Sequence, residues 1–570
     1  MKIPTQNLLQ LAIVIFLLSC GRTEKQGTET QQDTWYKNAF IYNVEVGTFK
    51  DSDGDGLGDF KGLIQKLPYL DSLGVDVIWL SPFMPSPGKD DGYDITDYYR
   101  VNPKLGTMAD FDRFLAEAKS RKIRVITDIV LNHTSVEHPW FRKARADSNS
   151  KYRLWYVWAD KKPADADKGM VFPGVQKETW SYDSVAKKYY FHRFYKFQPD
   201  LNYGNPDVQR EAFNILKFWL KKGVDGYRLD AVPFIIDLPE TGSENPERML
   251  NLVARFRKEM IAVKPDALML GEANLAPEEN KDYFGDNGEG MQMMFNFYAN
   301  QYLFYALASG NISELVKALR DTKEKPPTAQ WAYFLRNHDE VDLARLSTKQ
   351  RNLIFAKFGP DSNMQLYERG IRRRLAPMLN NARQLRMAYS LLFSLPGAPV
   401  IRYGEEIGMG DDLSLQERLS VRTPMQWSPQ VNGGFSSSRT TVRPVISFGS
   451  YGYQRLNVAE QQRSPGSLLN FITHLSALRK QHPEIGLANF EVLDSKTDHI
   501  LAIDYRYQKK RLLIIHDFSK EPLAFHLDPA WSVAGTLNEL LSGRKLKIGR
   551  PDNVKIELEG YACRWYEILP

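Results

Sequence analysis

Short apolar segments alternate with longer amphipathic stretches along most of the chain. Eight of these segments are rich in β-branched and aromatic residues, and helical periodicity lies between most of them. Strands that alternate with helices indicate a parallel sheet, and eight is the strand number of a (β/α)8 (TIM) barrel. The pattern therefore predicts an α/β barrel whose strands lie at 39–46, 75–80, 124–130, 226–232, 267–273, 291–297, 331–336 and 399–403.

Two long stretches interrupt this alternation. Residues 134–205 follow the third strand, are rich in Trp, Tyr, Pro and Gly, and show no clean helical period, so we expect an inserted subdomain there. Residues 404–465 after the eighth strand are also irregular, and a helical pattern follows at Ser467 to Gln481. Alternating patterns then predict a small antiparallel β-sandwich. The expected domains are a barrel over 35–133 and 206–482, the insert over 134–205, and the sandwich over 483–570.

The first residues of the chain have the character of a targeting segment. Lys2 precedes an apolar run from Leu8 to Leu18, and Leu17-Leu18-Ser19-Cys20 resembles a bacterial lipoprotein cleavage box. The run is short for a permanent membrane helix. We expect a lipoprotein-type signal peptide over 1–20, a lipid anchor on Cys20, a flexible tether over 21–34, and an exported, membrane-anchored chain in the periplasm or at the cell surface. An uncleaved hydrophobic N-terminus is the alternative.

Composition and charge restrict the remaining possibilities. Hydrophobic residues at 43% and charged residues at 25% are typical of a folded, water-soluble protein. The net charge of +6 is mild for 570 residues, and the densest basic run, Arg369 to Arg374, is short. A solvated or internally paired run is therefore expected rather than a nucleic-acid partner. Besides Cys20 the chain has only Cys563, which leaves no internal disulfide after processing.

Acidic residues stand where three of the predicted strands end. In a barrel enzyme, the active site is built from residues just beyond the carboxyl ends of the strands, so these residues are expected to share one mouth. A buried ion pair at a strand end is the alternative for each acid taken singly. The polar residues at these ends are Asn132 and His133 on the third strand, Arg228 and Asp230 on the fourth, Glu272 on the fifth, and Asn337, His338 and Asp339 on the seventh.

Two carboxyl groups suffice to cleave a glycosidic bond with retention of configuration. One attacks the anomeric carbon, and the other donates a proton to the leaving oxygen and then activates the acceptor. Arg228 lies two residues before Asp230, so both side chains point to the same side of the strand, where the cation favours an ionised nucleophile. Glu272 has no adjacent cation in the sequence, which suits a general acid. We expect neutral imidazoles at His133 and His338 to donate to sugar hydroxyls.

A second acidic cluster follows the first predicted strand. Asp51, Asp53, Asp55 and Asp59 have the opening spacing of a calcium loop, in which Gly56 permits a sharp turn and Leu57 offers its carbonyl. The loop is not an EF-hand, because Gly62 stands where the bidentate Glu would be. We expect a compact loop around one Ca2+ ion. A metal-free turn is the alternative, and Mg2+ suits so many ligands less well.

Several of these segments resemble the conserved blocks of the α-amylase family of glycoside hydrolases. The blocks are DIVLNHTS, GYRLDAV, GEAN and RNHDE, and the resemblance covers nearly the whole mature chain. Asp200 belongs to a QPDLN segment that is similar to the marker of the oligo-1,6-glucosidase-like branch. The segments DDGYDI, GIRRRLAPML, YGEEIGMGDD and VRTPMQW look most like the trehalose synthases of this family, which are maltose α-D-glucosyltransferases.

The resemblance implies roles for particular residues. Asp230 would form the covalent glucosyl intermediate, Glu272 would be the acid/base, and Asp339 would hold sugar hydroxyls and favour distortion of the ring. The loop at Asp51 to Asp59 matches a family calcium site, and Asn132, Asp200 and Asp237 would form a second with nearby carbonyls. The residues implied to bind the nonreducing glucose are Asp94, His133, Gln198, Arg228, His338 and Arg422.

Three functions remain open on the sequence. The first is a trehalose synthase-like glucosyl transfer on maltose and maltooligosaccharides, in which released glucose captures the intermediate. The second is an exported α-glucosidase or α-amylase that admits water, which the lipoprotein-like leader favours. The third is a noncatalytic glucan-binding lipoprotein, because fold does not fix function. The partners expected are a small oligosaccharide substrate and, through the anchor alone, a membrane, whereas the sequence leaves the oligomeric state open.

Overall fold

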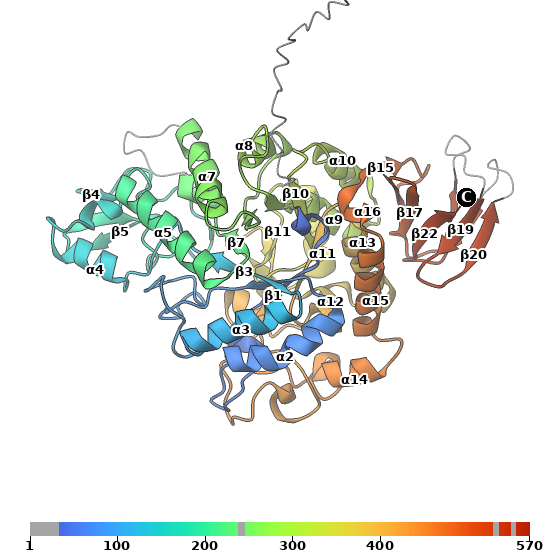
Figure 1. Cartoon of the computed structure of the whole chain (residues 1–570), viewed down its shortest axis with the longest axis horizontal. Coiled ribbons are helices and arrows are strands. Elements are labelled where there is room, and N and C mark those ends of the chain that lie inside the picture. Colours follow the sequence, from blue (N-terminus) through green and yellow to red (C-terminus); the bar gives the residue numbers. More distant parts are fainter. Residues whose placement is uncertain (1–33, 237–245, 528–534, 549–554, 570) are drawn as a thin grey trace, which may run out of the picture. The chain divides into compact units, whose positions relative to one another are not determined.

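The barrel predicted from the sequence is present in the computed structural model, which describes residues 34–236, 246–527, 535–548 and 555–569. Eight strands, all parallel, close into a TIM barrel in the order β1-β14-β10-β9-β8-β7-β3-β2 (Figure 1). The leader predicted for residues 1–20 and the tether up to residue 33 lie outside the described residues.

Each predicted segment overlaps one strand of the barrel. Every strand of the barrel is buried along nearly its whole length, because inward side chains fill the barrel and outward ones meet the helices. The filling of the interior includes Trp79, Leu270, Phe295 and Phe334. The strands are β1 (Ile41–Val44), β2 (Val77–Leu80), β3 (Arg124–Ile129), β7 (Gly226–Leu229), β8 (Leu268–Gly271), β9 (Met293–Phe295), β10 (Gln330–Phe334) and β14 (Ala398–Arg402).

Helices surround the barrel and begin and end at residues suited to those positions. In α5, for example, the Asn205 side chain accepts a hydrogen bond from the amide of Asp207, Pro206 fills the first turn, and Gly223 ends the helix at φ +111°. Among the described residues, no helix is long and apolar enough to cross a membrane. The longer helices are α2 (Phe60–Leu73), α3 (Met108–Ser120), α5 (Pro206–Lys222), α7 (Pro246–Ile261), α9 (Phe297–Ser309), α10 (Ser313–Asp321), α11 (Thr348–Phe358), α13 (Ala382–Ser394) and α15 (Leu468–Gln481).

The stretch predicted as an insert contains a small antiparallel sheet. Its strands are β4 (Trp158–Ala159), β5 (Trp180–Asp183) and β6 (Lys188–Phe191), in the order β4-β6-β5, and helix α4 (Pro139–Ala146) precedes them. A β-bridge between His133 and Asp200 joins the two ends of the stretch. Side chains near these ends are thereby held at the mouth of the barrel.

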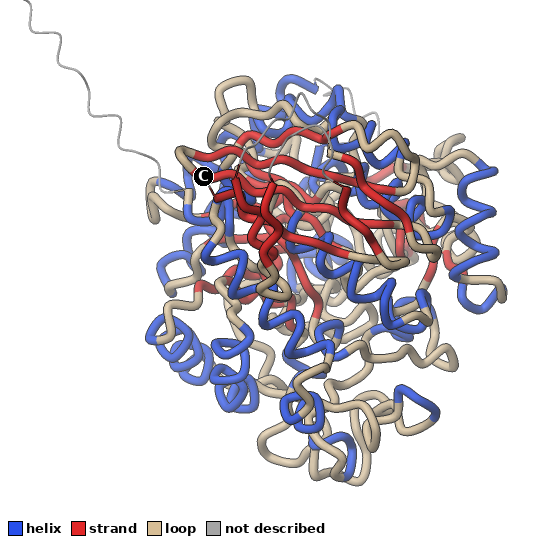
Figure 2. Tube along the Cα trace, turned by 90° about the vertical axis from the view of Figure 1, so that its right-hand side faces the viewer, coloured by secondary structure: helices blue, strands red, loops and turns tan. Residues whose placement is uncertain are grey.

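The C-terminal part is antiparallel, as predicted. Six strands form one sheet in the order β15-β16-β17-β22-β19-β20, two more pair as β18-β21, and apolar side chains of both enclose a separate core. Figure 2 views the chain from the side of this sheet. The indole of Trp565 donates to Ser390 of α13 at 2.9 Å. The strands are β15 (Asn489–Leu493), β16 (Ile500–Tyr507), β17 (Lys510–Asp517), β18 (Leu523–His526), β19 (Gly535–Glu539), β20 (Lys545–Ile548), β21 (Lys555–Leu558) and β22 (Cys563–Leu569).

Candidate active site

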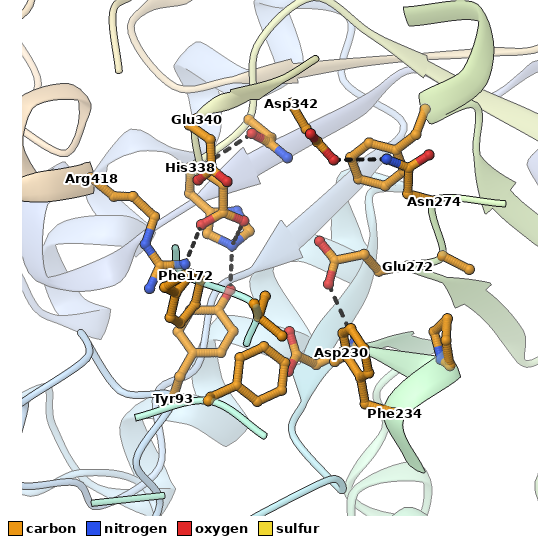
Figure 3. A pocket seen from close by; sticks show the side chains of 18 of the residues that line it. Tyr93, Phe172, Asp230, Phe234, Glu272, Asn274, His338, Glu340, Asp342 and Arg418 are labelled. Atoms are coloured by element: carbon orange, nitrogen blue, oxygen red, sulfur yellow. Dashed lines mark hydrogen bonds and ion pairs between the residues drawn. The ribbon is translucent and has the colours of Figure 1, made fainter. Parts of the chain in front are cut away.

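A cavity of about 420 Å3 lies where the barrel strands end. The residues that follow β7, β8 and β10 supply three of the carboxyl groups that line it, which are Asp230, Glu272 and Asp339. Side chains of the inserted stretch, including Phe172 and Gln198, form part of its wall. Figure 3 shows Asp230 and Glu272 facing the same space, with His338 and Arg418 nearby. The structure therefore brings together the three acids that the sequence placed at separate strand ends.

One guanidinium group contacts two of these acids. Arg228 on β7 lies 2.5 Å from Asp230 Oδ1 and 2.6 Å from Glu272 Oε2, and it also lies 2.6 Å from Asp128 Oδ1. Arg228 contacts Asp230, as expected, but it also contacts Glu272, for which the sequence showed no adjacent cation. Strands β7 and β8 are neighbours, with Arg228 opposite Leu270, so a residue distant in the sequence comes within reach.

Burial and shared charge still separate the protonation of the two carboxyls. The pKa of Glu272 is raised to about 7, mainly by burial; Arg228 opposes the rise, and the negative charges of Asp230 and Asp339 add to it. Burial also raises the pKa of Asp230, to about 6, while Arg228 opposes the rise. A single cation cannot compensate three carboxylates, so the cluster holds protons near neutral pH. Of the two, Glu272 has the higher pKa, which suits the general acid.

Asp339 has the opposite environment. Burial alone would raise its pKa, but the guanidinium groups of Arg418 and Arg422 outweigh burial and hold the pKa well below its usual range. Arg418 contacts Asp339 Oδ1 at 2.8 Å, Arg422 contacts the same oxygen at 3.1 Å, and His338 Nε2 lies 3.1 Å from Oδ2. Asp339 is therefore an ionised acceptor, suited to holding hydroxyl groups.

Three of the expected sugar-binding residues line the cavity. They are His133, Gln198 and His338. Burial lowers the pKa of His133 to about 3, and burial also lowers that of His338 well below its usual value, so both rings are neutral hydrogen-bonding groups. Tyr93 stacks on His338 with an interplanar angle of 10°, and its hydroxyl lies 2.6 Å from His338 Nε2. Tyr93 lies inside the DDGYDI segment, but no pattern in the sequence marked it as a site residue.

Asp94 is placed elsewhere. Its buried carboxylate accepts hydrogen bonds from Ser86 Oγ at 2.6 Å and from the amide of Lys89 at 3.1 Å. Asp94 is not one of the described residues that line the cavity. Asp90, four residues earlier, lines the wall instead and accepts from Gln198 Nε2 at 3.0 Å. Both carboxylates belong to the same DDGYD segment, and the spacing alone did not indicate which of them faces the cavity.

Arg422 acts on the site from behind its wall. It is buried, contacts Asp339, and pairs with Asp91 at 2.8 Å.

The basic run Arg369 to Arg374 forms ion pairs within the chain, which is one of the two arrangements expected from the sequence. Arg373 lies 3.3 Å from Asp411, and Arg374 lies 3.3 Å from Glu405.

The acidic loop partly has the arrangement expected of a cation site. Carboxylate oxygens of Asp51, Asp53 and Asp59 can all lie within 4.8 Å of one another. Asp51 also accepts hydrogen bonds from the amides of Gly54 at 2.7 Å and Gly56 at 2.9 Å, which fixes the loop. Asp55 instead accepts from the amide of Leu57 at 2.8 Å and is not in the group. Three hard oxygen donors fit a Ca2+ ion.

Two of the three residues implied for a second cation site lie close together. The amide of Leu201 donates to the Asn132 carbonyl at 2.8 Å, and Asp200 bridges to His133. Asp237 lies outside the described residues. The second set therefore stays a prediction.

The sequence is similar to those of several known proteins. A family model described as alpha amylase, catalytic domain, matches residues 41–358 and 366–487. Trehalose synthase of Thermus thermophilus is 41% identical over 498 residues, which are 86% of this chain and 51% of the relative, so the chain spans about half of that protein. Trehalose synthase/amylase TreS of Mycobacterium tuberculosis is 40% identical over 94% of this chain and 90% of the relative. Oligo-1,6-glucosidase of Parageobacillus thermoglucosidasius is 30% identical over 94% and 99%.

Several solved structures resemble this chain along most of its length. Trehalulose synthase MutB from Pseudomonas mesoacidophila superimposes with a TM-score of 0.75 at 25% identity over 94% of this chain and 99% of that chain. Trehalose-6-phosphate hydrolase TreA of Bacillus licheniformis gives 0.76 at 27% over 94% and 100%. The family match contains Arg228 and the three carboxyls at the strand ends, Asp230, Glu272 and Asp339. The chain thus belongs to the alpha-amylase family and is an enzyme of the glycosidase and transglucosylase kind.

Proposed function

We propose that the enzyme transfers a glucosyl group within maltose or a short maltooligosaccharide by two displacements at Asp230, as in a trehalose synthase. The observation that carries this is the pair of Asp230 and Glu272 on one guanidinium, with the higher pKa on Glu272. Relatives named trehalose synthase at about 40% identity support the same substrate class. A related solved structure holds sucrose, which is described as its substrate.

In the first step, an Asp230 oxygen attacks the anomeric carbon of the nonreducing glucose. The proton of Glu272 passes to the glycosidic oxygen, that bond breaks, and glucose leaves. In the second step, Glu272, now a carboxylate, takes a proton from the 1-hydroxyl of the glucose that has turned in the pocket. That oxygen attacks the glucosyl ester, Asp230 leaves as a carboxylate, and trehalose forms. Asp339, His133 and His338 would hold the ring throughout.

The purified protein with maltose is the direct test of this proposal. We expect trehalose to exceed free glucose among the products resolved by chromatography. Glucose alone would reject the transfer and leave the exported α-glucosidase or α-amylase, in which water attacks the same ester. If neither product forms while maltose still binds, the noncatalytic function is correct.

We expect a bell-shaped dependence of kcat/KM for maltose on pH. Protonation of Asp230 removes the nucleophile, so activity falls below about pH 6; loss of the Glu272 proton removes the acid, so activity falls above about pH 7. The Glu340 carboxyl also lines the cavity, and burial raises its pKa to about 7. In Glu340→Gln the basic limb should persist, and its disappearance would assign that limb to Glu340.

We also propose one or two structural Ca2+ ions, the first held by Asp51, Asp53 and Asp59. An ion that binds only the folded state stabilises it by about 2.7 kcal/mol at 100 times its Kd. Chelation should therefore lower the Tm by several degrees in a calorimetric scan. In Asp53→Asn the response to chelator should be much reduced. An unchanged Tm in the parent protein would contradict the claim.

For the leader, we propose export and lipid attachment at Cys20. The support is the Leu17-Leu18-Ser19-Cys20 segment, which has the sequence of a lipoprotein cleavage box. Metabolic labelling with a fatty acid should mark the mature chain and should fail with Cys20→Ala. Label that persists in Cys20→Ala would reject this anchor.

A further inference from the structure

Three segments far apart in the sequence meet beside the cavity. Tyr195 comes from the inserted stretch, Tyr367 follows β12 (Gln365–Leu366), and Glu417 begins the short helix η6 (Glu417–Val421) after β14. The hydroxyls of Tyr195 and Tyr367 both donate to Glu417 Oε2, at 2.5 Å and 2.7 Å, and lie 3.1 Å from one another. We name these three residues the Glu417 junction. Hydrogen bonds to a carboxylate are among the stronger ones in proteins.

The junction supports the cavity wall from behind. The ring of Phe172 lies 4.7 Å from the ring centres of both Tyr195 and Tyr367, and the guanidinium of Arg418 lies 5.0 Å from the ring centre of Phe172. Phe172 and Arg418 line the cavity (Figure 3). Tyr195, Tyr367 and Glu417 are not among the described residues that line it. The junction can therefore hold the wall in place without itself contacting the sugar.

The residue that follows Glu417 contacts Asp339, one of the three carboxyls of the candidate active site. Arg418, the neighbour of Glu417, contacts Asp339 Oδ1 and Asp90 Oδ1, each at 2.8 Å. Asp90 in turn accepts a hydrogen bond from Gln198 of the inserted stretch. The inserted stretch is thus tied to η6 at two points, one through Glu417 and one through Asp90 and Arg418. The adjacent residues Glu417 and Arg418 therefore connect the position of the inserted stretch with that of Asp339.

The backbone of the junction is in an uncommon conformation. Tyr367 has φ +55° and Glu417 has φ +42°, the left-handed region that bulky residues rarely adopt. Such conformations persist where the surroundings over-determine them, and they cluster at ligand clamps and switch regions. Here the two hydrogen bonds to Glu417 and the two ring contacts of Phe172 supply that constraint. These contacts hold the junction in one arrangement, with Tyr367 in the turn between β12 and β13 (Gly370–Ile371).

We propose that the Glu417 junction determines which acceptor takes the glucosyl group, by keeping the inserted stretch seated so that released glucose stays and water is excluded. This inference rests on the proposed function. With the junction intact, the 1-hydroxyl oxygen of the retained glucose attacks the ester. With the junction broken, the oxygen of water attacks and glucose forms instead. In both cases Glu272 takes the proton of the attacking oxygen, and Asp230 leaves as a carboxylate.

The test compares the products that Glu417→Gln and Tyr195→Phe form from maltose with those of the parent. Each variant weakens the junction and keeps the size of the side chain. We expect the ratio of glucose to trehalose to rise about tenfold in Glu417→Gln, the change that loss of one hydrogen bond to a charged group can produce, and less in Tyr195→Phe. Maltose consumption should change less than the product ratio does, because the junction does not line the cavity and Arg418 keeps its own contacts with Asp90 and Asp339. Tyr182→Phe, an exposed tyrosine of β5, is the matched control. An unchanged ratio in both junction variants would overturn the inference.

A second measurement separates this inference from the proposed function. The dissociation rate of 1-deoxynojirimycin, an iminosugar that mimics glucose, reports opening of the cavity without any product. We expect release about tenfold faster in Glu417→Gln and unchanged in Tyr182→Phe. A parent enzyme that makes only glucose would reject the transfer function, whereas equal release rates in parent and junction variants would reject the junction. Tyr195→Phe keeps this comparison available if Glu417→Gln does not fold.

Discussion

Replacing Asp230 with Asn should lower maltose turnover by about 10^4-fold or more and leave the fold intact. An amide has the shape of the carboxylate and can still accept a hydrogen bond from Arg228, but it cannot attack the anomeric carbon. The substitution also removes one of three negative charges from around a single cation, so stability should not fall. Initial rates of maltose consumption and a thermal scan on the same sample measure both effects.

A covalent label distinguishes a nucleophile from a residue that merely supports the site. A 5-fluoro-α-glucosyl fluoride slows the second step and should leave one sugar on the peptide that contains Asp230 in the parent protein. The Asn variant should stay unlabelled. Label on a different carboxyl, such as Asp128 or Asp339, or full activity of the variant, would overturn the assignment.

The barrel was predictable because its physical signature is local. Each strand is buried on both faces, so it appears in the sequence as a short run of apolar and β-branched residues between amphipathic helices. Strand β8, for example, spans Leu268–Gly271 inside the predicted 267–273 segment. The strand end then fixed where Glu272 had to lie, because side chains after parallel strands of a barrel meet at one mouth. The positions of the strand ends were therefore enough to predict that the three carboxyls lie together.

Contacts between loops were not predictable in the same way. Asp90 and Asp94 have the same side chain four residues apart, and the turn between them decides which one faces the cavity. The junction of Tyr195, Tyr367 and Glu417 joins three irregular stretches, where no period in the sequence reports pairing. Arg228 illustrates the limit most clearly, since its contact with Glu272 crosses between neighbouring strands. Sequence spacing describes a strand and its ends, and it carries little information on partners across space.

Replacing Glu272 with Gln should lower turnover of maltose by about 10^2 to 10^4-fold, the usual contribution of a general acid. The sugar leaving group of maltose needs a proton as its bond breaks, and an amide has none to give. The fluoride of α-glucosyl fluoride leaves as an anion without that proton, so formation of the Asp230 ester from this substrate should be nearly unaffected. The amide keeps the size of the side chain and can still accept from Arg228 and from the Ala231 amide.

The same variant tests the second role of Glu272, because the acceptor must lose a proton to it in the next step. With α-glucosyl fluoride, the variant should release about one fluoride per protein in a burst and then stall at the ester. Azide carries no proton to lose, so adding it should restore turnover and yield an α-glucosyl azide. A loss of rate that is equal for maltose and the fluoride, with no burst and no azide effect, would mean that Glu272 positions the substrate. Proton transfer would then have to come from another carboxyl of the cavity, and Glu340, in which burial raises the pKa to about 7, would be the first to examine.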